Sequence, residues 1–330
     1  MNSEVKYITE FPDTGNKYDE KTWYNDHDNS LVIINCCATN IYYTEHWTPL
    51  SIKCAFNGKE YYKFKNTTYA VDDNNFLLLN EGNTYSSYIN TESITESFTI
   101  NFTKKNIEDL SAFVFYNENS LLDDPFKILP NEIRIYEKLY AQTYTTKAYI
   151  NIIKNYQYHD GKDARQLLET LHLFLGELVT FNGIIDGEID NVQAKKRITR
   201  EEIYTRLHRV KDYIHSCYNE DISLDTLSKI SYLNTFHLLR EFKKYFHITP
   251  HKYLTQIRLK QALKLISQTD TKLVDIITEV GFEDLSSFSK LFKSYFGKSP
   301  QQFRAVKTNY KPLLLQSKII QTIFPSALYN

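Results

Sequence analysis

The feature that most constrains this 330-residue sequence is an internal repeat with a spacing of 50 residues. Residues 224–253 and 274–303 carry apolar, turn and basic positions in the same order. The matched pairs include Asp225 with Asp275, Ile230 with Val280, Phe242 with Phe292, Lys243 with Lys293, and Pro250 with Pro300. Each copy predicts a short helix, a tight turn and a second helix with a basic outer face, which is the helix-turn-helix pattern.

The second helix of each copy combines an apolar stripe with a polar face. In residues 235–246 the stripe is Leu238, Phe242 and Phe246, which recur every four residues and so share one side of a helix. The second copy has Phe288, Phe292 and Phe296 at the same places. Asn234 is a suitable N-cap for the first of these helices. A helix that enters the major groove needs this division, because one side anchors it and the other contacts DNA.

A further helix is predicted between the two copies, over residues 250–267. As a continuous helix it would be about 27 Å long at 1.5 Å per residue. Recognition helices on one side of B-DNA lie about 34 Å apart, so this helix could hold two modules near that spacing. The region is also basic: residues 198–307 hold 18 Lys and Arg against 12 Asp and Glu, whereas residues 1–197 hold 19 against 28. This asymmetry indicates an anionic partner for the C-terminal part.

Residues 22–103 are predicted to be rich in β-structure. Five short segments contain many β-branched or aromatic residues, namely 31–36, 50–56, 60–64, 76–79 and 97–102. The pair Asn57-Gly58 between two of them predicts a hairpin. Strands at this spacing predict a small barrel or sandwich, and a barrel of this size could hold one small ligand.

From about residue 131 the pattern becomes helical. Tyr136 and Leu139 recur at helical spacing, and residues 164–181 are apolar around much of a helical circumference. Such a helix must be buried, either in the core of its own domain or in a dimer contact. Residues 183–200 contain two glycines and scattered charge, which predicts an interdomain linker.

No catalytic residue is predicted. His27 and His46 lack a second ligand at short spacing, so neither a metal site nor a cofactor is expected. Cys36 and Cys37 lack the C-x-x-C spacing of a zinc site. No apolar run reaches the roughly 18 residues of a membrane span, and the start lacks the apolar core of a signal peptide. A cytoplasmic protein without a membrane partner is therefore expected.

The most specific segment of the sequence is DIITEVGFEDLSSFSKLFKSYFGKSPQQFR, which follows DISLDTLSKI and FHLLREFKKYF in the first copy. Over about residues 200–305 the chain resembles the AraC/XylS family of transcription regulators. The resemblance implies an α+β chain with two domains: a seven-helix, all-α tandem helix-turn-helix domain that binds DNA, and an N-terminal effector-binding or dimerisation domain built as a cupin-like β-barrel with following helices. The implied bounds are 1–182 for the N-terminal domain (barrel about 22–103, helices about 131–182), 183–200 for the linker, 201–306 for the DNA-binding domain and 307–330 for a C-terminal extension.

The resemblance places the base-reading positions at Phe236, Leu239 and Arg240 in the first recognition helix, and at Leu285, Ser286, Ser287 and Lys290 in the second. His237, Lys243 and Lys293 lie on the polar faces of the same helices and complete the candidate DNA-contact residues. Arg240 and Lys290 are expected at base edges, and Lys243 and Lys293 at phosphates. Leu239 and Leu285 depart from the polar residues common in the family, and an apolar side chain can contact a thymine methyl but cannot hydrogen-bond a base. His247 replaces the usual Gly at the end of the first recognition helix, and Ser231 and Tyr232 replace small turn residues.

The expected function is therefore that of a sequence-specific transcription regulator, an activator and not an enzyme, that reads two successive major grooves. Its expected partners are double-stranded promoter DNA, RNA polymerase, a small-molecule effector in the N-terminal domain and a second copy in a homodimer. One alternative is a cupin-like enzyme or a DNA-repair protein that carries the same DNA-binding module. Another is a nucleoid-type binder without an effector or a sequence preference.

Overall fold

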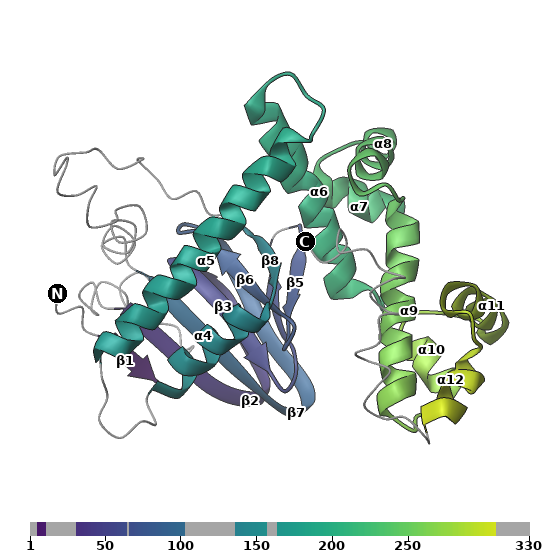
Figure 1. Cartoon of the computed structure of the whole chain (residues 1–330), viewed down its shortest axis with the longest axis horizontal. Helices are drawn as coiled ribbons and strands as arrows, with labels where there is room; N and C mark the ends of the chain where they lie inside the picture. The colour runs from purple at the N-terminus through teal and green to yellow at the C-terminus, as the bar shows by residue number, and fades with distance from the viewer. Residues whose placement is uncertain (1–4, 11–30, 65, 103–135, 157–163, 308–330) are drawn as a thin grey trace. The chain divides into compact units, whose positions relative to one another are not determined.

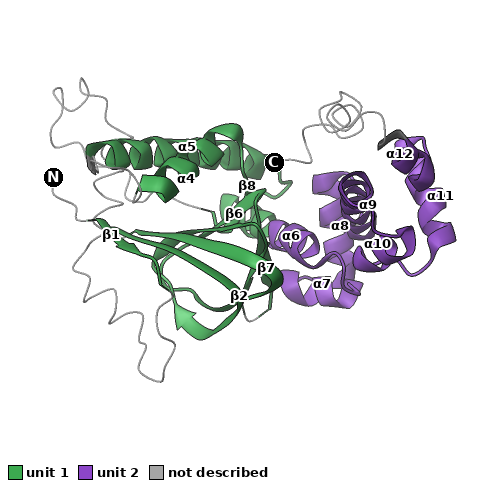
Figure 2. Cartoon of the chain, turned by 90° about the horizontal axis from the view of Figure 1, so that it is seen from below, with its two compact units in different colours: residues 1–205 green, residues 206–330 purple. Residues whose placement is uncertain are grey.

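The computed structural model describes residues 5–10, 31–64, 66–102, 136–156 and 164–307. They divide into two compact units, residues 1–205 and 206–330, which are coloured separately in Figure 2. The first unit is built on a sheet and the second is helical, as expected for a mixed α+β chain.

The first unit contains one sheet of eight strands. They are β1 (Val5–Ile8), β2 (Leu31–Trp47), β3 (Leu50–Phe56), β4 (Glu60–Lys63), β5 (Thr68–Val71), β6 (Asn75–Leu79), β7 (Thr84–Phe102) and β8 (Lys138–Ala141). The strand order is β1-β2-β7-β3-β6-β8, with β4 paired to both β5 and β7. Only the β1–β2 pair is parallel among the described strands. Since no described pairing joins β1 to β8, the sheet is open over these residues, and a closed barrel stays a prediction.

The predicted hairpin at Asn57-Gly58 is wrong, although the turn itself is real. Asn57 adopts a left-handed backbone with φ of 62°, as the sequence led us to expect. However, β3 and β4 pair end to end with the same edge of β7 instead of with each other. Gly58 lies so close to Thr95 of β7 that a Cβ at this position would overlap the threonine hydroxyl. The glycine is therefore needed for close approach to the long strand rather than for a hairpin.

Two helices, α4 (Tyr144–Asn155) and α5 (Ala164–Asp190), lie along one face of the sheet (Figures 1 and 2). Phe174 of α5 meets Phe76 of β6 edge to face with ring centroids 5.9 Å apart. Phe181 of α5 stacks on Tyr140 of β8 at 6.0 Å. By length and composition alone, Arg165–Asp190 is apolar enough to cross a membrane, contrary to the expectation that no segment would be. Its aromatic contacts with the sheet are those of a core helix.

The other face of the sheet has a polar and aromatic character. Lys53, Thr99 and Leu77 are register partners on adjacent strands, so they share the face opposite to Phe76. The buried Lys53 ammonium lies 5.3 Å from the ring centroid of Tyr85. Burial raises the pKa of Glu60, which is hydrogen-bonded to side chains that include Ser97, Tyr62 and Ser87. A buried acid, a lysine and several tyrosines therefore occur together on one side of this unit.

The helix expected from about residue 131 begins later than predicted. Residues 138–141 form strand β8, which pairs with β6, so the helical interpretation of Leu139 is wrong. Short apolar runs fit a strand or a helix equally well, and here pairing with an open sheet edge decides the outcome.

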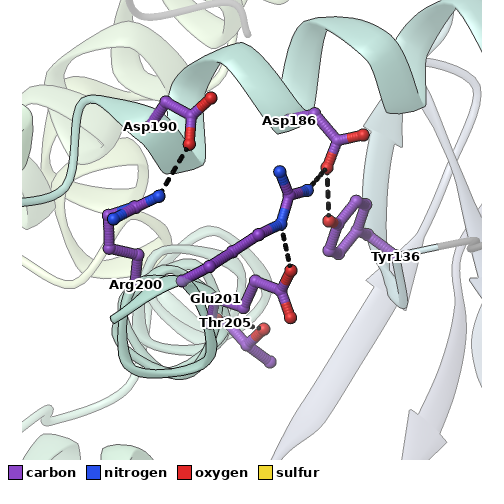
Figure 3. Close-up of polar contacts among 7 residues, drawn as sticks. Tyr136, Asp186, Asp190, Arg200, Glu201 and Thr205 are labelled. Carbon is purple, nitrogen blue, oxygen red and sulfur yellow. Dashed lines mark hydrogen bonds and ion pairs between the residues drawn. The ribbon is translucent and has the colours of Figure 1, made fainter. Parts of the chain in front are cut away.

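The predicted linker at residues 183–200 is mostly helical. Helix α5 continues to Asp190, and six residues separate it from α6 (Arg197–Cys217). Arg197 binds Asp186 at 2.6 Å and Glu201 at 2.8 Å, and Arg200 binds Asp190 at 3.0 Å. Figure 3 shows these ion pairs across the α5–α6 connection, with the Tyr136 hydroxyl donating to Asp186 at 2.8 Å.

The assignment of residues 183–200 as an interdomain linker stays a prediction, although most of this segment is helical. The charged residues that resembled a solvated linker are partners for one another, so they hold the helix ends in place. Burial, together with Asp186, raises the pKa of Tyr136 to about 12. The tyrosine therefore stays a neutral hydrogen-bond donor at ordinary pH.

The second unit confirms the repeated helix-turn-helix pattern. After α6 come α7 (Leu224–Ser231), α8 (Thr235–Phe246), α9 (Pro250–Gln268), α10 (Leu273–Glu279), α11 (Leu285–Phe296) and α12 (Pro300–Lys307). Helix α9 lies between the pair α7–α8 and the pair α10–α11 (Figure 1). Apart from Lys307, the predicted C-terminal extension at 307–330 lies outside the described residues.

The two turns differ although their sequences are aligned. In the first turn the left-handed residue is Tyr232, with φ of 54°, and in the second it is Gly281, with φ of 86°. The aligned positions would be Ser231 and Gly281, so the first turn is shifted by one residue. One residue separates Tyr232 from the cap Asn234, whereas two separate Gly281 from the cap Asp284.

The recognition helices end in the same left-handed conformation but with different residues, His247 with φ of 61° and Gly297 with φ of 74°. A side chain is strained there by about 1–2 kcal/mol, partly offset because glycine loses more backbone entropy on folding. We expect His247→Gly to raise the free energy of unfolding by about 0.5 kcal/mol, measured by urea denaturation. The reciprocal Gly297→His should lower it, because nothing lies within 4 Å to compensate. A loss of stability in His247→Gly would contradict this explanation.

Candidate nucleic-acid interface

Helix α8 separates into a buried and an exposed side, as predicted. The Asn234 side chain caps it by accepting a hydrogen bond from the His237 backbone amide at 2.8 Å. Leu238 and Phe242 are fully buried, and the ring centroids of Phe242 and Phe246 lie 4.5 Å apart. This packing fixes the rotation of the helix about its own axis.

The exposed side of α8 contains most of the predicted contact residues. Phe236 is 85% exposed, which is unusual for a phenylalanine in a folded domain. The Arg240 side chain is 71% exposed, and Lys243 is also exposed. His237 and Leu239 are half-buried at the edges of this side. A large exposed aromatic next to two cations is suited to a partner with both apolar and anionic groups, such as the major groove and its phosphates.

Helix α11 repeats the arrangement with smaller side chains. Asp284 caps it, and its Oδ2 accepts from the Ser287 amide at 2.6 Å. Hydrogen bonds from Ser287 and Ser286, with Lys290 nearby, hold the pKa of Asp284 below its usual value. Phe288, Phe292 and Phe296 form the buried stripe, whereas Ser286, Ser287, Lys290 and Lys293 are exposed.

Leu285 has a different place from the other candidates. It is half-buried and packs against the core cluster of α9, α10 and α11. Packing in the core therefore explains why an apolar residue occurs at this position, and only the exposed part of the Leu285 side chain could touch a base.

One residue of α8 that sequence reasoning missed is Glu241. Its side chain is only 8% exposed, and its Oε1 accepts a hydrogen bond from Nε of Arg240 at 3.0 Å. Nε2 of His237 lies 3.5 Å from the same oxygen. An acidic residue beside the buried Phe242, in an otherwise basic helix, was the signal in the sequence.

A second missed residue, Arg258 of α9, connects the two modules. Its Nε donates to the Tyr218 carbonyl at 2.7 Å, and its Nη2 donates to the Glu220 carbonyl at 2.8 Å. Its guanidinium lies 5.9 Å from the Phe282 ring centroid, and a Cβ on Gly281 would come within 3.0 Å of it. The end of α6 and the turn of the second module therefore meet at one side chain.

The described residues contain no group of three or more His, Cys, Asp and Glu side chains suited to a metal ion. Cys36, Cys54 and Cys217 are buried, and Cys37 is exposed. Burial raises the pKa of Cys36 to about 12, which disfavours its reactive thiolate form.

Comparison with known proteins places the similarity in this helical unit. A family model described as a helix-turn-helix domain matches residues 227–305. The Msm operon regulatory protein of Streptococcus mutans is 35% identical over 40% of this chain and 47% of its own length. The activator AarP of Providencia stuartii is 34% identical over 28% of this chain and 70% of its own length. AdaA of Bacillus subtilis, a bifunctional transcriptional activator and DNA repair enzyme, is 34% identical over 29% of this chain and 45% of its own length. This chain thus matches less than half of the first and third of these relatives.

Proposed function

Since this chain belongs to the AraC/XylS family of transcription regulators, we propose that it activates transcription by binding specific promoter DNA. The observation that carries the proposal is the pair of recognition helices, α8 and α11, each anchored by a buried stripe and exposing a polar face. With α9 between them, the two helices would enter two successive major grooves.

The exposed residues of these helices would make two kinds of contact with DNA. Arg240 and Lys290 would contact base edges, and Lys243 and Lys293 would hold phosphates. Phe236 would lie against a thymine methyl or another apolar part of the groove, because it has no hydrogen-bonding group.

Arg240→Ala tests the base contact. A bidentate arginine–guanine pair discriminates against a wrong base, so its loss should cost about 1–3 kcal/mol on the cognate site and relax specificity there. The cognate site is obtained first by selection from random DNA, and affinities for cognate and random duplexes are then compared at one salt concentration. Equal weakening on both duplexes would contradict the assignment.

Lys293→Ala tests the phosphate contact and is a matched control. It should weaken binding to cognate and random DNA alike, because phosphates occur in every sequence. The slope of log affinity against log salt should fall by about 0.9 for one lost phosphate contact on B-DNA. An unchanged slope together with altered specificity would instead place Lys293 at a base.

For the first unit we propose a cupin-like domain that binds a small-molecule effector in the cytoplasm and supports a homodimer. The buried polar and aromatic face around Lys53 and Glu60 supports ligand binding, since such groups fix the orientation of a small molecule. Leu173 and Ile184 of α5 are 55% and 50% exposed and are candidates for the dimer contact. DNA selection with and without small molecules from a cell extract would test the effector, and RNA polymerase recruitment on the selected site would test activation.

The second candidate function is that of an enzyme or repair protein with the same module, which the relation to AdaA favours. The metal content of the purified full chain distinguishes the two. Stoichiometric zinc or iron would support the enzymatic alternative. If the purified chain contains no bound metal, a metal-dependent enzyme is excluded.

A further inference from the structure

The two recognition helices differ in one buried charge. Glu241 follows Arg240 in α8, whereas the equivalent pair in α11 is Lys290 followed by Leu291, which is 40% exposed. The predicted base-reading cation of the first module is therefore hydrogen-bonded to a buried carboxylate, whereas Lys290 lies near the exposed carboxylate of Asp284 and is followed by an apolar residue. In a helix meant to face phosphates, a negative charge weakens binding unless it has a specific use.

The geometry of the contact between Arg240 and Glu241 indicates what the carboxylate does. The bond from Arg240 to Glu241 at 3.0 Å is made by Nε, the guanidinium nitrogen nearest the chain. A guanidinium has five N–H donors in a fixed plane, so a bond at Nε sets the orientation of the two terminal amino groups. These groups remain outside this bond and can make the two parallel hydrogen bonds that guanine O6 and N7 accept.

The different burial of Glu241 and Arg240 also indicates that Glu241 orients the arginine. The Glu241 side chain is 8% exposed and is held by the helix core, whereas that of Arg240 is 71% exposed. The buried Glu241 carboxylate thus holds the exposed Arg240 side chain at its Nε. An unrestrained arginine loses considerable side-chain freedom when it is ordered on DNA, and a pre-oriented one loses less. Nε2 of His237 also lies 3.5 Å from this oxygen.

We propose that Glu241 is a positioning residue for DNA specificity, an inference that rests on the proposed function. Glu241 orients Arg240 toward a guanine edge, and its negative charge lowers the attraction of this helix for phosphates. The first module then depends on base reading more than the second, where Lys290 is a point charge beside an apolar residue. Glu241 itself does not touch the DNA in this arrangement.

The test is a double-mutant cycle on the full chain with Glu241→Leu, which copies Leu291, and Arg240→Ala. The measured quantity is the ratio of affinities for selected cognate DNA and random DNA, by fluorescence anisotropy at fixed salt. We expect Glu241→Leu to lower this ratio about tenfold, within the range of one bidentate base contact, mainly by strengthening binding to random DNA and weakening the cognate complex. In the Arg240→Ala background the same change should leave the ratio unaltered, because the side chain that Glu241 orients is gone.

Two further variants keep the result interpretable. Glu241→Gln preserves shape and a neutral acceptor, so the ratio should fall by only about threefold, since a hydrogen bond without the charge is roughly half as strong. It replaces Glu241→Leu if the latter fails to fold in a thermal denaturation control. Glu279→Gln removes one exposed charge elsewhere in the domain and should raise both affinities alike.

The outcomes separate the inference from the function on which it rests. An unchanged ratio in the folded Glu241 variants, or equal losses with and without Arg240, would show a purely structural role and overturn the inference alone. If the unaltered chain shows no preference for any DNA sequence, the proposed function fails and the inference fails with it.

Discussion

Replacing Phe242 by Ala is expected to lower the free energy of unfolding of the helical unit by about 3–5 kcal/mol, the usual cost of a large cavity in a packed core. Phe242 is fully buried, and its ring lies 4.5 Å from that of Phe246 and 6.1 Å from that of Tyr253. Both neighbours anchor helices of the first module, so they cannot easily close the gap. Chemical denaturation followed by circular dichroism measures the loss.

Phe236→Ala is the matched control, because it makes the same chemical change six residues earlier in the same helix. With 85% of Phe236 exposed, its removal should alter stability by no more than about 0.5 kcal/mol. It should nevertheless weaken DNA binding if the ring faces the groove. A large loss of stability in Phe236→Ala, or none in Phe242→Ala, would mean that the two sides of α8 are assigned the wrong way round.

Arg258→Ala is expected to produce the second large effect, on the spacing of the two modules. It removes two charge-assisted hydrogen bonds to the carbonyls of Tyr218 and Glu220, which should cost about 2–3 kcal/mol of stability. It also removes the side chain that contacts the turn around Gly281. On cognate DNA we expect nuclease protection of one of the two major grooves to weaken, because the second recognition helix is no longer held at a fixed distance.

Two other variants make the Arg258 experiment specific. Arg258→Lys keeps the charge but has one compact donor group, so it should not restore a contact that needs two carbonyls at once. Lys252→Ala removes a cation from an exposed position of the same helix and should leave stability nearly unchanged. Equal behaviour of the alanine variants at 252 and 258 would reduce the role of Arg258 to its charge.

The helical unit could be predicted closely because its pattern is local and occurs twice. The expected helices at 235–246 and 250–267 agree with α8 and α9 to within one residue, and Asn234 is the cap that its sequence position indicated. Apolar spacing and capping act over a few residues, so they are visible in the sequence. The exposure of Arg240, Lys243, Lys290 and Lys293 followed from the same spacing.

The failures lie where distant residues decide the structure. Residues 138–141 become a strand because β6 offers an edge some 60 residues earlier. Residues 183–190 become helical despite Gly183 and Gly187, in a segment whose end is held by Arg197 and Arg200. The shift of the first turn to Tyr232 and the partnership of Glu241 with Arg240 depend on three-dimensional geometry that an alignment of the two copies does not contain.

The two hydrogen bonds of Arg258 have a consequence for how such a protein can diverge. Both acceptors are main-chain carbonyls, and every amino acid supplies one at that place. Substitutions at positions 218 and 220 therefore keep both carbonyl acceptors of Arg258, and changes on the exposed sides of α8 and α11 do not involve these acceptors. A lineage can thus exchange the side chains that we propose contact DNA, while the distance between its two modules is inherited unchanged.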